Sequence, residues 1–320
     1  AGNIIEKENL TVPDIKITGK NLDIESAIAL FPQKYRTVFS DYVSKGKITF
    51  ICKITGEISK GRSPGIKAEF NVENGSIKQK NTSYSLNSIR LKGTYSNGKN
   101  KNPSSTVIEI KDLFATLGIA GNENPEGNIE AGFLIKNLNT PRIKLFAMAT
   151  LDLDKAGKFI AMDTLENISG TVDMKINYEG SLKSKDEFSV QDFRNSKSSG
   201  DINFHHVNFS LKQSTLSYRD FSGNFILRNN DVLIKEMKGK ISSSDFELSG
   251  LFRNALAWLF LPEEKLTVEA AFYSNNLNLN ELLSEGESKR DTSYLLSFPE
   301  RVNLNLNAEI ASLSFRKFNA

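Results

Sequence analysis

The sequence is poor in the residues that build disulfides and metal sites. Cys52 is its only cysteine, so the chain can form neither an internal disulfide nor a cysteine-based zinc site. Its two histidines, His205 and His206, are adjacent, and in a strand we expect one ring on each side. Histidine-rich metal catalysis is therefore nearly excluded, and we expect neither a metal nor a cofactor.

The chain also lacks a strong net charge and a long apolar run. Its 41 basic and 38 acidic side chains give a formal charge of +3, without the concentrated basic excess typical of nucleic-acid binding. The longest apolar run, residues 255–261, is far short of the ~20 residues that cross a bilayer. Around Trp258 we expect a buried strand or short helix, with a membrane-touching or partner-binding edge as the alternative.

Sequence motifs for catalysis are missing as well. Residues 118–121 lack the third glycine of a dinucleotide loop, and residues 56–65 lack the lysine and hydroxyl residue of a P-loop. Glu263 and Glu264 follow Pro262 in an expected solvated turn, where acid/base chemistry is not favoured. We therefore expect no enzymatic activity.

Alternation of apolar and polar residues is abundant instead. In residues 47–55, Ile48, Phe50, Cys52 and Ile54 alternate with polar residues, which places them on one face of a strand. Similar alternation occurs in residues 66–72, 129–135, 145–151, 171–179, 221–227, 246–248 and 302–310. Turn-forming residues at 73–75, 96–98 and 228–231 have spacings suited to hairpins. The sequence therefore predicts an antiparallel sheet with one apolar and one solvated face.

Helical spacing is confined to residues 24–43, which Gly46 would end, and to the shorter segments 153–162 and 279–283. Each segment follows a similar tag: Asn-Leu-Asp-Ile at 21–24, Thr-Leu-Asp-Leu at 150–153 and Asn-Leu-Asn-Leu at 276–279. An amphipathic strand follows each helix, so the chain reads as a repeat. We place repeats at 21–149 and 150–275, a truncated third at 276–320, and the end of an earlier one at 1–20.

The sequence resembles AsmA-like proteins in two respects. It has the repeated tag with a helix and a strand after each copy, and it has strand patterns at 64–77 and 239–250 that are typical of that family. The resemblance implies an elongated, curved β-groove of repeating units, each beginning with a short helix. It also implies the periplasm of a Gram-negative bacterium and a parent protein anchored in the inner membrane through an N-terminal helix outside this chain. The function implied is passive phospholipid transfer between inner and outer membranes during outer-membrane biogenesis. The implied partners are phospholipid acyl chains, the two membranes through parts outside this chain, and envelope proteins.

A long apolar sheet face must be covered by another layer or by lipid, and the few expected helices cover only part of it. Exposing an acyl chain to water costs about 0.8 kcal/mol per CH₂, so a lipid conduit needs continuous apolar contact. The expected groove lining is Ile48, Phe50, Ile54, Ile66, Phe70, Val172, Met174, Ile176, Phe246, Leu248, Leu304 and Leu306. The alternative is a sandwich-like scaffold that binds protein or glycan in the cell envelope.

Overall fold

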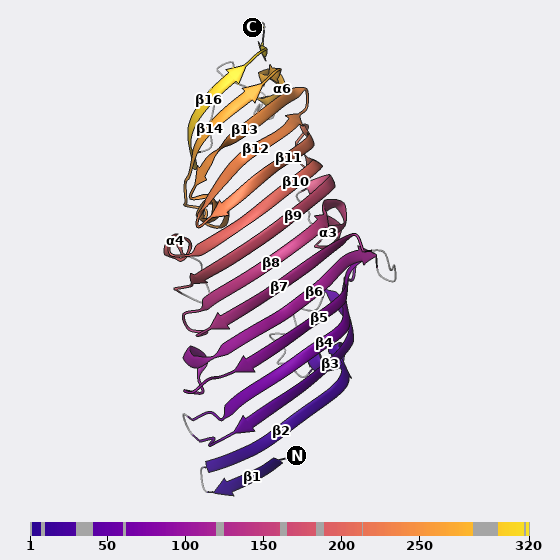
Figure 1. Ribbon diagram of the computed structural model, residues 1–320, viewed down its shortest axis with the longest axis vertical. Helices are drawn as coiled ribbons and strands as arrows, with labels where there is room; N and C mark the ends of the chain where they lie inside the picture. Colours follow the sequence, from indigo (N-terminus) through magenta and orange to yellow (C-terminus); the bar gives the residue numbers. More distant parts are fainter. Residues whose placement is uncertain are drawn as a thin grey trace, which may run out of the picture. The chain divides into compact units, whose positions relative to one another are not determined.

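The computed structural model describes residues 2–7, 10–29, 41–59, 62–119, 125–160, 165–183, 189–212, 214–283, 300–316 and 318–319. Its main sheet contains 15 strands, which follow one another in hydrogen-bonded order from β1 to β14 and end with β16 (Figure 1). The sheet is antiparallel except between β14 and β16, which run parallel. The prediction of a mainly β, antiparallel fold is therefore confirmed.

The chain divides into two compact units, the first made of Ala1–Ala149 with Asn177–Asp192 and the second of Thr150–Ile176 with Phe193–Ala320. The division at residues 149 and 150 coincides with one expected repeat boundary, while the repeats themselves stay a prediction. The strands that begin in the first unit are β1 Gly2–Lys7, β2 Leu10–Asp23, β3 Tyr42–Thr55, β4 Gly65–Gln79, β5 Tyr84–Ser96, β6 Val107–Ile119, β7 Gly127–Lys136 and β8 Arg142–Asp152. Its helices are α1 Ile24–Ala29, η2 Pro103–Ser105 and α4 Val190–Arg194.

The second unit continues the pattern of long strands joined by short connections. Its strands in the main sheet are β9 Leu165–Ser181, β10 Lys197–Leu211, β11 Ser217–Arg228, β12 Asp231–Ile241, β13 Ser244–Arg253, β14 Leu266–Ser274 and β16 Val302–Ile310. A small separate sheet contains β15 Leu277–Asn278, β17 Leu313–Phe315 and β18 Phe318–Asn319. The helices that begin in this unit are α3 Leu153–Phe159, α5 Ala255–Phe260 and α6 Leu279–Leu282.

The repeated tag lies where a strand ends and a helix begins. The Asp152 carboxylate accepts a hydrogen bond from the Lys155 backbone N–H at 3.2 Å, which caps α3. The Asn278 side-chain oxygen likewise accepts from the Asn280 backbone N–H at 3.1 Å and caps α6. Asp23 ends β2 immediately before α1. Such caps satisfy backbone donors that the first helical turn leaves unpaired, which explains why Asp or Asn recurs there.

A series of β-bulges crosses neighbouring strands of the first unit. Register shifts between paired strands occur at successive pairs from β2 to β7. Close to these shifts, single residues adopt the positive φ angles that bulges require; they are Asn21, Gly46, Asn74, Ser88 and Asp112. A bulge bends and twists its strand, so these shifts together bend the first unit's sheet across its strands.

Two sequence expectations are corrected by these bulges. Residues 73–75 form no hairpin turn, because β4 continues and Ile77 pairs with Ser44 of β3. The expected helix over 24–43 is α1 as far as Ala29, residues 30–40 lie outside the described residues, and Tyr42 already belongs to β3. Gly46, expected to end that helix, is instead a bulge residue with φ of 120° inside β3. Asn and Gly favour positive φ in bulges as they do in hairpin turns, which made the two indistinguishable in the sequence.

The expected turn at 228–231 does form a tight hairpin, since Arg228 pairs with Asp231 between β11 and β12. The turn at 96–98 instead opens a longer connection that contains η2. The helix expected over 153–162 is α3 as far as Phe159, and residues 161–164 lie outside the described part of the chain.

Replacing Gly46 by alanine should destabilise the protein. A Cβ atom at Gly46 would lie 2.6 Å from the Gly75 Cα atom, and φ of 120° is strained for any L side chain. We expect Gly46→Ala to lower the free energy of unfolding by on the order of 1–3 kcal/mol, measured by urea denaturation. Gly65→Ala on β4 is the matched control, because its Cβ atom would meet no atom closer than 3.4 Å. Equal stability of the two variants would contradict the role given to this bulge.

Candidate functional site

Strand register gathers apolar side chains of the first unit on one face of its sheet. Three facing pairs between β3 and β4 form its centre: Ile48 with Val72, Phe50 with Phe70, and Ile54 with Ile66. Directly facing residues project to the same side of a sheet, so the pairing extends this face to the neighbouring strands. The added residues are Ile15 and Ile17 on β2, Cys52, Ala68, Leu91, Tyr95, Ile108, Ile110, Phe133 and Ile135. We call this set the unit 1 apolar face.

The unit 1 apolar face is only partly covered by the described residues. Near one end, Ile24 of α1 and Ile48 pack against the buried cluster of Val72, Ile89 and Ala115. Farther along the strands the side chains are half-buried, and Ile17 remains 45% exposed. A set of apolar side chains that pack beside one another but stay open to solvent can receive an apolar ligand.

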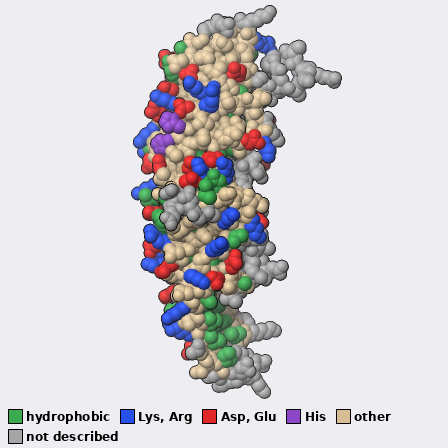
Figure 2. Space-filling model, turned by 90° about the vertical axis from the view of Figure 1, so that its right-hand side faces the viewer, with side chains coloured by type: hydrophobic (Ala, Val, Ile, Leu, Met, Phe, Trp, Pro, Cys, Tyr) green, Lys and Arg blue, Asp and Glu red, His purple; other side chains and the backbone are tan. Residues whose placement is uncertain are grey.

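The other side of the same strands carries charge. Ion pairs there include Lys47 with Asp23 at 2.8 Å and Lys111 with Glu109 at 3.2 Å. Figure 2 shows Lys and Arg side chains interspersed with Asp and Glu side chains on the face it presents. The expected division into an apolar and a solvated face therefore holds for the first unit.

In the second unit the corresponding apolar face is rich in aromatic rings. Phe246 on β13 lies between Phe221 and Phe272, with ring centroids 5.2 and 6.5 Å away. Phe209 and Tyr218 stack at 4.6 Å. These rings line a cavity of about 340 Å³ together with Met237, Ile241, Ser244, Asp245, Leu248, Leu277 and Leu282. A second cavity of about 160 Å³ shares Phe209, Phe221 and Met237 with it. We call the apolar side chains of both cavities the unit 2 apolar face.

A polar anchor holds the rim of the larger cavity. Asp245 accepts hydrogen bonds from the Asn275 backbone and side chain and from the Asn276 backbone, at 2.8–3.1 Å. Burial alone would raise the pKa of Asp245, but these hydrogen bonds outweigh burial and lower the pKa. The anchored connection leads directly into β15 and α6, whose Leu277 and Leu282 line the cavity.

The residues predicted to line a groove are distributed over both faces. Ile48, Phe50, Ile54, Ile66 and Phe70 belong to the unit 1 apolar face, and Phe246 and Leu248 line the unit 2 cavity. Leu304 and Leu306 pair with Val268 and Ala270 and are 47% and 38% exposed. Val172, Met174 and Ile176 alternate on β9 with Asp173, whose carboxylate lies 3.2 Å from His205. They therefore occupy the strand face opposite the Asp173–His205 contact.

Several cavity residues were missing from the sequence prediction, above all Tyr218, Phe221 and Met237. Asp220 has φ of 55°, and the β11 register shifts between Arg219 and Ser222. The bulge places residues 218 and 221 on the same face despite opposite parity, so simple alternation could not group them. The only other sign of this grouping in the sequence was that Tyr218 and Phe221 are both aromatic.

A bulge also corrects the expectation that the two histidine rings lie on opposite sides. His206 has φ of 50°, which interrupts the alternation of β10. His206 Nδ1 lies 2.6 Å from Asp220 Oδ1, and both histidines are visible on the face shown in Figure 2. Among the described residues no group of three His, Cys, Asp or Glu side chains could hold a metal ion.

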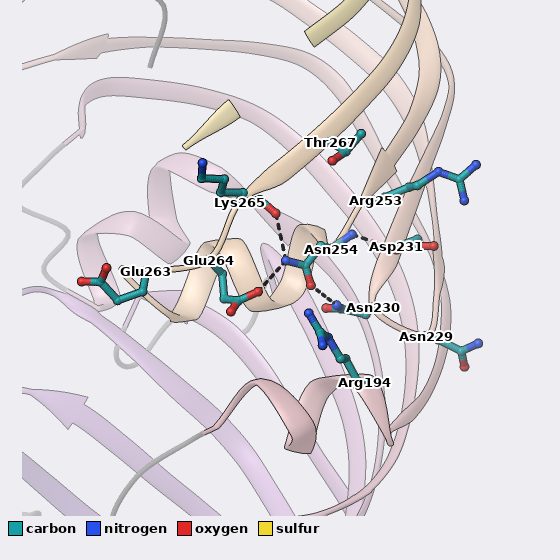
Figure 3. A pocket seen from close by; sticks show the side chains of 10 residues that line it. All are labelled: Arg194, Asn229, Asn230, Asp231, Arg253, Asn254, Glu263, Glu264, Lys265 and Thr267. Atoms are coloured by element: carbon teal, nitrogen blue, oxygen red, sulfur yellow. Dashed lines mark hydrogen bonds between the residues drawn. The ribbon is translucent and has the colours of Figure 1, made fainter. Parts of the chain in front are cut away.

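A polar cavity of about 620 Å³ lies beside α5 (Figure 3). Its centre is Asn254, whose side-chain N–H groups donate to the Glu264 carboxylate and the Lys265 carbonyl, both at 2.8 Å. The Asn230 side chain bonds to Asn254 and accepts from the Ala257 backbone N–H at 2.9 Å. These bonds fix the start of α5, so the network has a structural role. Glu264 belongs to it and lies in the expected turn.

The apolar run at 255–261 is only partly buried. Ala257 is fully buried, but Leu259 and Phe260 are 65% and 59% exposed at the end of α5. Arg301 secures this end by donating to the Trp258 and Leu261 carbonyls at 2.6 and 2.7 Å. The expected burial is therefore correct for Ala257 and wrong for Leu259 and Phe260, because a helix of this length has only one face against the sheet.

Comparison of the chain with protein-family models, curated proteins and solved structures found no match in any of the three. Within the part of the chain that the structure describes, no helix has the length and apolar character needed to span a membrane.

Cys52 lies on the unit 1 apolar face and provides a native probe of it. Burial raises the pKa of the Cys52 thiol above its ordinary value of 9.0, because a partly buried thiolate loses hydration. Thiolate is the reactive form, so the alkylation rate of the folded protein should reach half its maximum at a higher pH than the rate of the same thiol in urea. Identical rate profiles in the folded and unfolded states would contradict the placement of Cys52.

Proposed function

We propose that the chain is an AsmA-like protein that carries phospholipid acyl chains passively along the apolar face of each unit. The observation that supports this most is the register of β2 to β7, which groups apolar side chains on one face while ion pairs occupy the other. A face used only as a core would be covered. Here most side chains beyond α1 are half-buried, while Ile110 is buried and Ile17 is exposed.

The energetics favour such a surface for lipid. Fourteen acyl carbons in water cost on the order of 11 kcal/mol, so each step of a chain along a protein must keep apolar contact. Ile, Leu, Val and Phe give this contact without fixed polar partners, which permits sliding. The proposal assigns no catalysis and no cofactor to the chain, and headgroups stay in water.

The proposal also covers the cellular location of the chain and its parent protein. We place the chain in the periplasm of a Gram-negative bacterium, within a parent protein anchored in the inner membrane. Phospholipid would enter and leave through parts of the parent at the inner and outer membranes. Outer-membrane biogenesis is the process that such transfer would serve.

Photocrosslinking in cells tests the proposal position by position. A crosslinking residue at Phe50, Phe246 or Leu304 should capture phospholipid. Phe50 and Phe246 lie on the apolar faces, and Leu304 pairs with Val268, which shares a strand face with Phe272 of the larger cavity. The matched controls are the adjacent polar positions Thr49, Glu247 and Asn303, which project to the opposite side. Capture should be several-fold higher at the apolar member of each pair. Equal capture within the pairs, or none, would refute lipid binding by these faces.

A further inference from the structure

Glycines in the unit 1 apolar face lie beneath phenylalanine rings. A Cβ atom at Gly93 on β5 would be 2.1 Å from Cζ of Phe70 on β4. A Cβ atom at Gly19 on β2 would be 2.4 Å from Cε1 of Phe50 on β3. Both rings therefore lie flat across a neighbouring strand, in space that only glycine leaves free.

The two pairs belong to one row across four strands. Gly19 faces Phe50, Phe50 faces Phe70, and Phe70 faces Gly93. The ring of Phe50 leans toward β2 and that of Phe70 toward β5, so the adjacent rings lean away from each other. Between β3 and β4 the apolar face therefore has no projecting rings, whereas two upright rings of Phe50 and Phe70 would project from it side by side.

The second unit also has a glycine beneath a phenylalanine ring, although here the ring lies against a second ring at an interplanar angle of 63°. A Cβ atom at Gly239 on β12 would be 2.9 Å from Cδ2 of Phe221 on β11. Phe221 also packs against Phe246, with centroids 5.2 Å apart, and both rings line the larger cavity. Glycine is unfavourable inside a strand, so its recurrence beneath rings of the apolar faces calls for a reason.

We infer that Gly19, Gly93 and Gly239 are positioning residues that keep these rings flat, so that an extended acyl chain can pass across the strands. This inference rests on the proposed function. Alanine at Gly93 would force the Phe70 ring upward into the path. A chain crossing the raised ring would lose contact for about two methylene groups, which corresponds to roughly tenfold slower passage.

The test measures transfer of pyrene-labelled phosphatidylglycerol between phosphatidylethanolamine vesicles by the purified chain. Gly93→Ala should slow transfer about tenfold, while Gly65→Ala on β4, where a Cβ atom has room, should match the unaltered chain. Replacing the ring as well by a smaller apolar side chain, in Gly93→Ala with Phe70→Leu, should restore the rate, because leucine keeps apolar contact on this face. If Gly93 had a purely structural role, the second substitution would not restore the transfer rate. Thermal unfolding of each variant is measured as a control for stability.

The results distinguish failure of the proposed lipid transfer from failure of the role inferred for the glycines. If the unaltered chain transfers no lipid, the proposed function fails. If it transfers lipid and Gly93→Ala behaves like Gly65→Ala, or the double variant stays slow, the function stands and the inference is overturned. Should Gly93→Ala not fold, Gly239→Ala with and without Phe221→Leu gives the same comparison in the second unit.

Discussion

The architecture depends on keeping the two-residue alternation of neighbouring strands in phase. A register slip of one residue would move every apolar side chain of a strand to the solvated face. Between β3 and β4 the facing pairs Phe50 with Phe70 and Ile54 with Ile66 show the phase that results. Opposite-face pairs such as Lys53 with Lys67 remain with solvent. Burial of the apolar members gives each register its energetic preference.

A bulge changes the alternation of a strand at one point, and beyond the bulge the apolar residues again lie on the apolar face. On β4 the pairing passes from Val72 to Gly75, and on β11 from Arg219 to Ser222. A strand with one additional residue changes parity at that point, so its apolar residues must change parity too. Tyr218 and Phe221 do so, and they meet Phe209 and Phe246 on one face. Bulges thus bend the sheet within each unit without dividing that unit's apolar face.

Much of the fold could be predicted from the two-residue alternation of strands and from the residues that cap helices. The predictions that failed did so for physical reasons. Alternation at 47–55 and 302–310 predicts β3 and β16 well, and the Asp and Asn tags locate the starts of α3 and α6. Asn74 and Gly75 serve a bulge as readily as a turn, so residues 73–75 were misassigned. For the candidate site, parity found Phe246 and Leu248 and grouped Phe221 with Phe225, but it missed Tyr218, which lies across the bulge at Asp220.

Exposure could be predicted least, because it depends on packing between segments distant in sequence. Leu259 and Phe260 occur in the most apolar run yet face solvent, while Ala257 in the same helix is fully buried. The half-buried state of the unit 1 apolar face is likewise a property of the folded chain. The proposed lipid binding depends on this half-buried state, because the core of a closed scaffold would be covered.

Native mass spectrometry of the chain purified from Gram-negative cells tests this distinction most directly. Lipid binding predicts phospholipid adducts that delipidation removes and incubation with phospholipid vesicles restores. A chain that is free of lipid after purification, and that takes up none from vesicles, would contradict the central claim and favour the closed scaffold.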